Sequence, residues 1–130
     1  KGNSTLQSLN LEDNGLGPEG GAALAEGLRG NSTLQSLNLL NNSLGPEGCA
    51  ALVEGFKGNS TLQSLDLGGN RLCGIDWYGD GTYTTEAITK LCEGLKGSAV
   101  TSLNLWGNNL TDKDEQVLKD ASGSSVHIRF

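Results

Sequence analysis

The 130-residue sequence lacks several features that mark particular classes of protein. It has no methionine, two prolines and a single histidine, His127, close to its last residue. No apolar run approaches the roughly 20 residues of a membrane-spanning helix, and no signal peptide is visible. No zinc-ligand spacing, phosphate-binding loop or nucleophile–base pair can be found. We therefore expect one domain that is not an enzyme and needs no cofactor.

Aromatic residues and basic charge are also scarce. The chain has two residues each of Trp, Tyr and Phe, and its formal net charge is −6. An acidic surface repels the phosphates of nucleic acids and of anionic membranes, so we expect neither as a partner. The same charge favours another protein as the partner, and among proteins a basic or neutral one.

The three cysteines, Cys49, Cys73 and Cys92, are odd in number and not closely paired. Such usage fits a reducing compartment better than a disulfide framework, and we expect a cytoplasmic protein. The helical pattern described below places Cys49 and Cys92 on buried faces, where packing is favoured over a metal or redox role. Because Cys73 begins an irregular segment, we expect its thiol to react fastest.

The chain is rich in repetition. The segment GNSTLQSLNL begins at Gly2 and again at Gly30, GNSTLQSLDL begins at Gly58, and the shorter GSAVTSLNL begins at Gly97. We expect four repeats, at about 2–29, 30–57, 58–96 and 97–123, with an insertion at 73–84 in the third and a closing strand at 126–130. The first repeat has no polar cap before it, which indicates a fragment of an array that is longer at the N-terminus.

Each repeat combines a strand pattern with a helix pattern. Leu9 and Leu11 alternate with Ser8 and Asn10, which is the two-residue period of a strand. The following GPEGGAALAEGL has proline at the expected helix start and apolar residues on one face. One strand and one helix cannot bury their apolar faces alone, so the repeats must stack. Because strands stack about 4.8 Å apart and helices about 8–10 Å, we expect a curved α/β stack with a concave parallel sheet inside and helices outside.

An asparagine recurs where each repeat turns out of its strand. Its amide can donate and accept hydrogen bonds with turn backbone groups that have no strand partner. We predict a structural ladder of these residues: Asn14, Asn42, Asn70 and Asn108.

The pattern L-x-x-L-x-L-x-x-N-x-L, followed by a helix, resembles the leucine-rich repeats of the ribonuclease-inhibitor type. The first repeat, LQSLNLEDNGLGPEGGAALAEGL, is nearly that pattern written out. Similar repeats occur in NOD-like receptors, in activators of the Ran GTPase and in protist arrays. The resemblance implies a right-handed solenoid that binds another protein through its concave face and rim, but it does not fix the partner.

The insertion breaks the repeat and carries half of the aromatic residues. Trp106 follows the fourth strand beside Gly68, whose lack of a side chain leaves space, and one repeat away from the insertion. Aromatic residues are frequent in binding hot spots, so we predict a partner-binding rim here. The candidate binding residues are Trp77, Tyr78, Tyr83, Trp106, Leu40, Asp66 and Glu12.

Two alternatives to a binding rim stay open. The insertion could fold on itself and only shield the solenoid edge, which would make the chain a structural spacer or C-terminal cap of a longer array with no ligand of its own. The insertion also resembles an EF-hand loop, with Asp76, Asp80 and Gly81 at positions one, five and six. Because Tyr78 occupies position three, a solvated acidic loop is favoured over a weak cation site.

Overall fold

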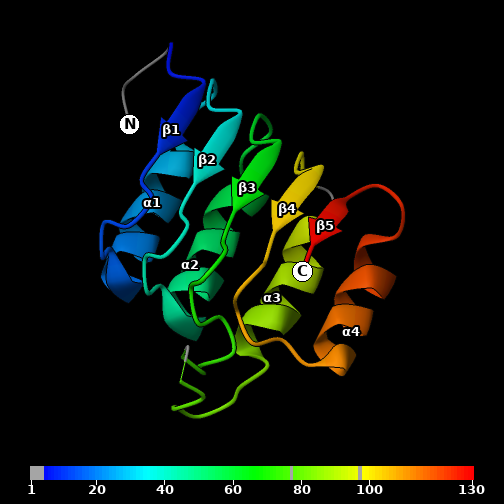
Figure 1. The fold of residues 1–130 in the computed structure, drawn as a ribbon. Coiled ribbons are helices and arrows are strands. Elements are labelled where there is room, and N and C mark those ends of the chain that lie inside the picture. Colours follow the sequence, from blue (N-terminus) through cyan, green and yellow to red (C-terminus); the bar gives the residue numbers. More distant parts are fainter. Residues whose placement is uncertain (1–4, 77, 97) are drawn as a thin grey trace.

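The structure is a computed structural model that describes residues 5–76, 78–96 and 98–130. Within these ranges strands and helices alternate, and the chain ends in a further strand (Figure 1). The strands are β1 (Ser8–Asn10), β2 (Ser36–Asn38), β3 (Ser64–Asp66), β4 (Ser102–Asn104) and β5 (His127–Arg129). The helices are α1 (Gly17–Arg29), α2 (Gly45–Lys57), α3 (Glu86–Leu95) and α4 (Asp112–Ser122).

The strands of the described residues form one parallel sheet in the order β1-β2-β3-β4-β5. Equivalent leucines are paired across it, Leu9 with Leu37, Leu37 with Leu65, and Leu65 with Leu103. A constant period returns the same residue to the same position on each strand, which fixes the register. The insertion lengthens one period from 28 to 38 residues without shifting the register.

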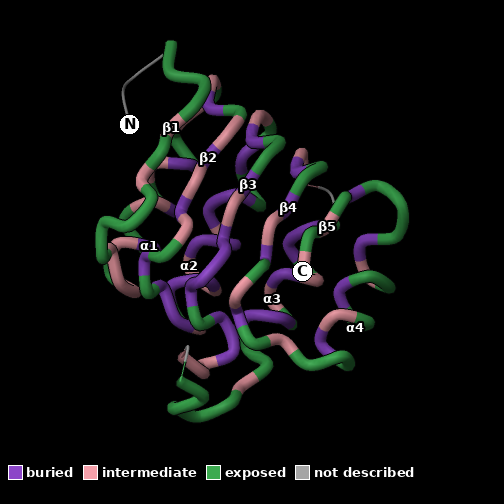
Figure 2. Tube along the Cα trace, viewed as in Figure 1, coloured by how far each residue is buried: buried purple, intermediate pink, exposed green. Residues whose placement is uncertain are grey.

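The helices form a second layer behind the sheet and pack against one another in chain order (Figure 1). The core lies between the layers, where Leu52, Val53 and Phe56 of α2 are completely buried. Burying one such side chain contributes about 1.5–3 kcal/mol to stability. Figure 2 shows that burial is denser in the second and third repeats than in the first. No helix in the described ranges combines the length and the apolar composition needed to cross a bilayer.

Helices α1 and α2 approach each other so closely that two positions have no room for a side chain. A Cβ atom on Gly21 would lie 2.7 Å from the carbonyl oxygen of Gly48, and one on Gly55 would lie 2.5 Å from the Cα of Ala25. The glycines that recur in the helices of the first two repeats therefore permit direct contact between the two helix backbones.

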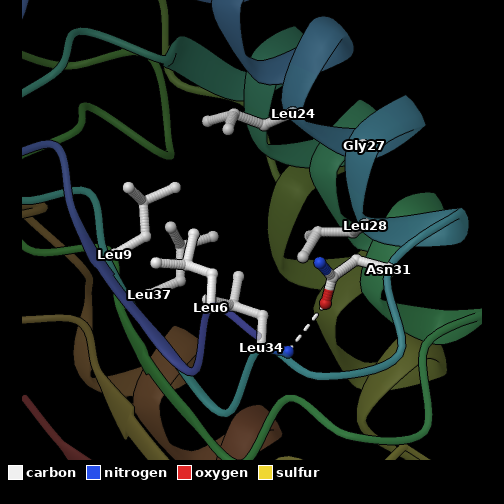
Figure 3. Close-up of a pocket in the computed structure, with 8 residues that line it drawn as sticks. All are labelled: Leu6, Leu9, Leu24, Gly27, Leu28, Asn31, Leu34 and Leu37. Carbon is white, nitrogen blue, oxygen red and sulfur yellow. Dashed lines mark hydrogen bonds between the residues drawn. The ribbon is translucent and has the colours of Figure 1, made fainter. Parts of the chain in front are cut away.

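The N-terminal edge leaves part of the core open. Leu6 is 37% exposed, and Leu9 and Leu24 are only partly buried. Figure 3 shows the open apolar hollow between β1, α1 and the following loop. It is lined by Leu6, Leu9, Leu24, Gly27, Leu28, Asn31, Leu34 and Leu37.

The C-terminal edge is more polar. At the start of α4, Thr111 Oγ1 accepts a hydrogen bond from Asp114 N at 3.0 Å, and Asp114 Oδ2 accepts one from Thr111 N at 3.0 Å. This reciprocal arrangement satisfies backbone N–H groups that a helix start would otherwise leave unpaired. Beyond α4, β5 exposes His127 and Arg129 to solvent and packs Ile128 against the core.

The predicted accessibility of Cys73 and Cys92 is wrong, whereas that of Cys49 is confirmed. Cys49 and Cys73 are completely buried, and Cys92 is partly exposed. Cys73 still belongs to the core, because the chain leaves the solenoid one residue later, and its Sγ lies 3.6 Å from Asp114 Oδ2. Burial, reinforced by the Asp114 charge, raises the pKa of Cys73 to about 12, and burial likewise raises the pKa of Cys49 to about 12. Cys92, not Cys73, is the accessible thiol.

Candidate protein-binding site

The turns that follow the strands lie along one edge of the solenoid, and we call this the loop edge (residues 12–16, 40–44, 68–76, 78–82 and 106–110). A ladder of asparagine side chains connects these turns. Asn42 Oδ1 accepts hydrogen bonds from Asn14 N at 3.0 Å and Leu16 N at 3.4 Å, and its Nδ2 donates to Leu11 O at 2.8 Å. The side chain thus completes the turn of the preceding repeat. The next two ladder asparagines repeat this pattern.

The ladder has a direction, because each asparagine serves the repeat before it. Asn14 has no preceding repeat in the described chain. Its Nδ2 donates within its own turn, to Leu11 O and Glu12 O, and its Oδ1 accepts no hydrogen bond from the described residues. At the opposite end, no ladder residue follows Asn108.

The insertion folds into a compact loop on the loop edge. Ile75 and Gly81 form an antiparallel bridge, and Asp76 N donates to Asp80 O at 2.9 Å. The two sides of the loop come so close that a Cβ atom on Gly81, where φ is 124°, would overlap the carbonyl oxygen of Gly74. Glycine is required here, since the backbone conformation and the contact both exclude a side chain.

The carboxylate of Asp76 organises the tip of this loop. Its Oδ1 accepts hydrogen bonds from Tyr78 N at 2.9 Å and from Asp80 N at 3.0 Å. An aspartate side chain that holds its own turn in this way is common in tight loops. Within the described part of the chain, no three His, Cys, Asp or Glu residues are grouped so that they could hold a metal ion.

Among the described residues, hydrogen bonds from the loop and from its last part attach the insertion to the fourth repeat. Asn109 Nδ2 donates to Asp76 O at 2.5 Å, and Tyr83 OH donates to Asp114 Oδ1 at 2.7 Å. The insertion is therefore fixed at both sides, once on the loop edge and once at the start of α4.

Asp114 is a structural residue that the sequence analysis missed. It is only 3% exposed, and its carboxylate accepts hydrogen bonds from Thr111, Cys73 and Tyr83. Burial raises the pKa of Asp114, but the hydrogen bonds, first of all that from Tyr83, outweigh burial and leave the pKa below its ordinary value. The spacing of Thr111 and Asp114 in TDKD was a detectable signal, since T-x-x-D resembles a helix-capping pattern.

Tyr83 lies apart from the predicted rim. Its side chain is 45% exposed, but its hydroxyl contacts Asp114, and it lines a groove between α3 and α4 together with Ile88 and Val117. The hydrogen bond from its hydroxyl gives Tyr83 a structural role in holding the insertion.

Tyr78 and Trp106 are the exposed aromatic residues that the structure places on the loop edge, with side chains 90% and 48% exposed. They belong to different repeats, but the hydrogen bond between Asn109 and Asp76 brings their two segments together. Trp77, which was predicted to act with them, lies outside the described residues.

The space that Gly68 leaves beside Trp106 is occupied by Leu40. A Cβ atom on Gly68 would lie 2.6 Å from Leu40 Cδ1 and 3.1 Å from Trp106 O. Leu40 is therefore partly buried and covers the end of β3. The space that was expected beside Trp106 at Gly68 is therefore filled by the protein itself.

The two acidic candidates contact asparagines on the open face of the sheet. Asp66 Oδ1 accepts hydrogen bonds from Gly68 N at 2.9 Å and Asn104 Nδ2 at 3.0 Å. Glu12 Oε1 accepts one from Asn38 Nδ2 at 3.3 Å. Both carboxylates remain at the surface, where they contribute negative potential to the loop edge and the adjoining sheet.

A comparison with protein families agrees with this geometry. A family model described as Leucine Rich repeat matches residues 2–25, 30–53 and 58–72, the last match ending at the insertion. The chain contains leucine-rich repeats. The predicted fold, a leucine-rich-repeat solenoid with a parallel sheet and helices, is thereby confirmed. A search among curated proteins found no match. Leucine-rich repeat domains are typically non-catalytic and generally serve as modules for protein interaction.

Proposed function

We propose that this leucine-rich repeat protein binds a protein partner through its loop edge and the adjoining concave face of the sheet, and catalyses no reaction. The exposure of Tyr78 and Trp106 on an edge fixed by hydrogen bonds carries this proposal. Tyr and Trp offer a large contact area for a small loss of conformational entropy, which is why they recur in binding hot spots. A spacer without a ligand has no need of such exposed rings.

The charge of the chain supports a basic partner. Glu12, Asp66, Asp76 and Asp80 lie on the loop edge or beside it, and the formal net charge is −6. Opposite charge on a partner would speed association, and salt would slow it. The three free cysteines favour a reducing compartment such as the cytoplasm, and the sequence pattern favours the ribonuclease-inhibitor type of repeat.

The substitution Trp106→Ala tests the proposal. The wild-type chain serves as bait to isolate a partner, and calorimetry then compares the affinities of wild type and variants. We expect Trp106→Ala to weaken binding by about 1–2 kcal/mol, which is about 10-fold, with little change in melting temperature. Val117→Ala is the matched control, because Val117 is exposed at 41% on α4, away from the loop edge.

Two results would contradict the proposal. Unchanged affinity of Trp106→Ala would remove the aromatic residue from the binding surface. A loss of about 3 kcal/mol or more in the free energy of unfolding would show that the ring belongs to the core. The insertion and Trp106 would then serve only the solenoid, as expected for a structural spacer.

A further inference from the structure

The turn after β4 lacks the ladder asparagine that completes each of the other turns. In the third turn, the backbone N–H groups of Asn70 and Leu72 converge on a single amide oxygen, Asn108 Oδ1, at 2.9 Å and 3.2 Å. The equivalent donors of the fourth turn are the N–H groups of Asn108 and Leu110. Neither donates a hydrogen bond to any of the described residues.

The fourth turn has the same backbone conformation as the others. In every turn the residue after the ladder asparagine is left-handed, with φ of 60° at Gly15, 54° at Ser43, 55° at Arg71 and 54° at Asn109. A left-handed conformation is uncommon for residues other than glycine, so its recurrence indicates one shared turn. The N–H groups of Asn108 and Leu110 therefore converge in the same way as the pairs that bind an amide oxygen.

An acceptor for the other half of an amide is also present. In the second turn, the carbonyl oxygen of Leu39 accepts a hydrogen bond from Asn70 Nδ2 at 2.8 Å. Leu39 lies three residues before the ladder asparagine of that turn, Asn42. The equivalent carbonyl in the fourth turn is that of Leu105. It accepts a hydrogen bond from Asn108 Nδ2 at 3.0 Å and retains a second lone pair.

The residues that carry these groups, Leu105, Asn108 and Leu110, line a surface hollow at the C-terminal end of the loop edge. The hollow has a volume of about 220 Å³, and Asn108 and Leu110 line it together with Trp106, Glu115 and Phe130. It therefore combines two backbone donors and a backbone acceptor with aromatic side chains and one carboxylate.

We propose that this hollow binds the side-chain carboxamide of an asparagine from a partner polypeptide. The amide oxygen would accept from Asn108 N and Leu110 N, and the amide nitrogen would donate to Leu105 O. The solenoid itself uses this arrangement three times, with Asn42, Asn70 and Asn108 as the bound amides. Glu115 selects against an aspartate, because a second carboxylate would be repelled.

This inference rests on the proposed function, because Trp106 borders the hollow and belongs to the proposed binding edge. It adds a chemical specificity to that surface. A site built to hydrogen-bond an amide rejects an apolar residue of similar size, since its polar groups would be left unpaired.

The test uses an octapeptide with the sequence LNLEDNGL, acetylated and amidated, which presents a ladder asparagine in the context of residues 9–16. Two control peptides replace the second asparagine of the octapeptide by leucine or by aspartate. The full chain is labelled with nitrogen-15, and its backbone amide resonances are followed during titration to about 5 mM peptide, since a single amide site is expected to be weak.

The asparagine peptide should shift the amide proton resonances of Asn108 and Leu110 downfield and leave the resonances of the first three ladder turns unchanged. The leucine and aspartate peptides should produce at most about a tenth of that shift at equal concentration, since a lost or unpaired polar contact costs about 1–3 kcal/mol. Equal shifts with all three peptides, or no shift of these two resonances, would overturn the inference.

The failure of this inference can be told from the failure of the proposed function. If Trp106→Ala weakens binding of the natural partner but the octapeptide leaves the amide resonances of Asn108 and Leu110 unchanged, the proposed carboxamide site is wrong and the proposed binding edge stands. If the octapeptide shifts both amides but Trp106→Ala leaves the partner's affinity unchanged, the proposed edge is wrong and the carboxamide site stands.

Discussion

At the scale of single residues, the ladder asparagines differ in how many backbone groups depend on them. Asn70 is completely buried, and its amide satisfies two N–H groups of the preceding turn and carbonyl groups of two repeats. Asn14 is exposed, and its amide donates only within its own turn. The same residue type in the same sequence pattern therefore has a different energetic role at the end of the solenoid and in its middle.

Replacing Asn70 by alanine should lower the free energy of unfolding by about 3–5 kcal/mol, because each buried backbone group left unpaired costs about 1–3 kcal/mol. Asn14→Ala is the matched control and should cost about 1 kcal/mol or less, since water can satisfy its turn. Denaturation with urea measures both values. Similar losses for the two variants would contradict the direction of the ladder.

At the scale of elements, the insertion is the part whose contacts the sequence did not predict. The constant period predicted the strands, their pairing and, apart from Cys92, the buried helix faces, because equivalent residues recur in equivalent surroundings. The insertion has no counterpart in other repeats, and its partners are distant in the chain. Tyr83 and Cys73 reach Asp114 across 31 and 41 residues. Periodicity carries no information on such unique pairs, which explains why the burial of Cys73 and the role of Tyr83 were missed.

The substitution Tyr83→Phe removes one hydrogen bond from the Asp114 carboxylate. We expect it to lower the free energy of unfolding at neutral pH by about 1 kcal/mol. Hydrogen bonds hold the pKa of folded Asp114 below its unfolded value of about 4, so this stabilisation is present above about pH 4 and is lost as the pH falls through the folded pKa. The difference between the variant and wild type should therefore shrink in acid.

Urea denaturation at neutral pH and at about pH 3 measures this difference, on either side of the unfolded pKa. Tyr78→Phe serves as the control, because its side chain is 90% exposed and should leave stability unchanged at both pH values. A difference for Tyr83→Phe that does not depend on pH would show that its hydroxyl does not act through Asp114.

At the scale of the whole molecule, burial is uneven along the solenoid. The equivalent strand leucines Leu37, Leu65 and Leu103 are 1%, 2% and 1% exposed, whereas Leu9 is only partly buried. In a stack of repeats, stability is approximately the sum of each repeat and its contacts with its neighbours. Within the described chain the first repeat has one neighbour and an open apolar hollow (Figure 3), so it should contribute least.

Leu65→Ala should therefore lower the free energy of unfolding by about 2–5 kcal/mol, and Leu9→Ala by about 1 kcal/mol. Both substitutions remove the same atoms from the same strand position, so the comparison isolates the effect of the neighbours. Urea denaturation gives the two values, and hydrogen exchange should show α1 losing protection before α2. Equal losses would indicate that the solenoid behaves as one uniform unit.

The direction of the asparagine ladder also bears on how the chain is made. A ribosome synthesises a protein from its N-terminus to its C-terminus. Each turn here is completed by an asparagine that follows 28 or 38 residues later. A newly made turn stays unfinished until the next repeat has been translated. Premature termination in the fourth repeat before Asn108 would leave the third turn without its asparagine, whereas the turns ahead of it would already be complete. Errors late in translation should therefore damage only the last finished repeat.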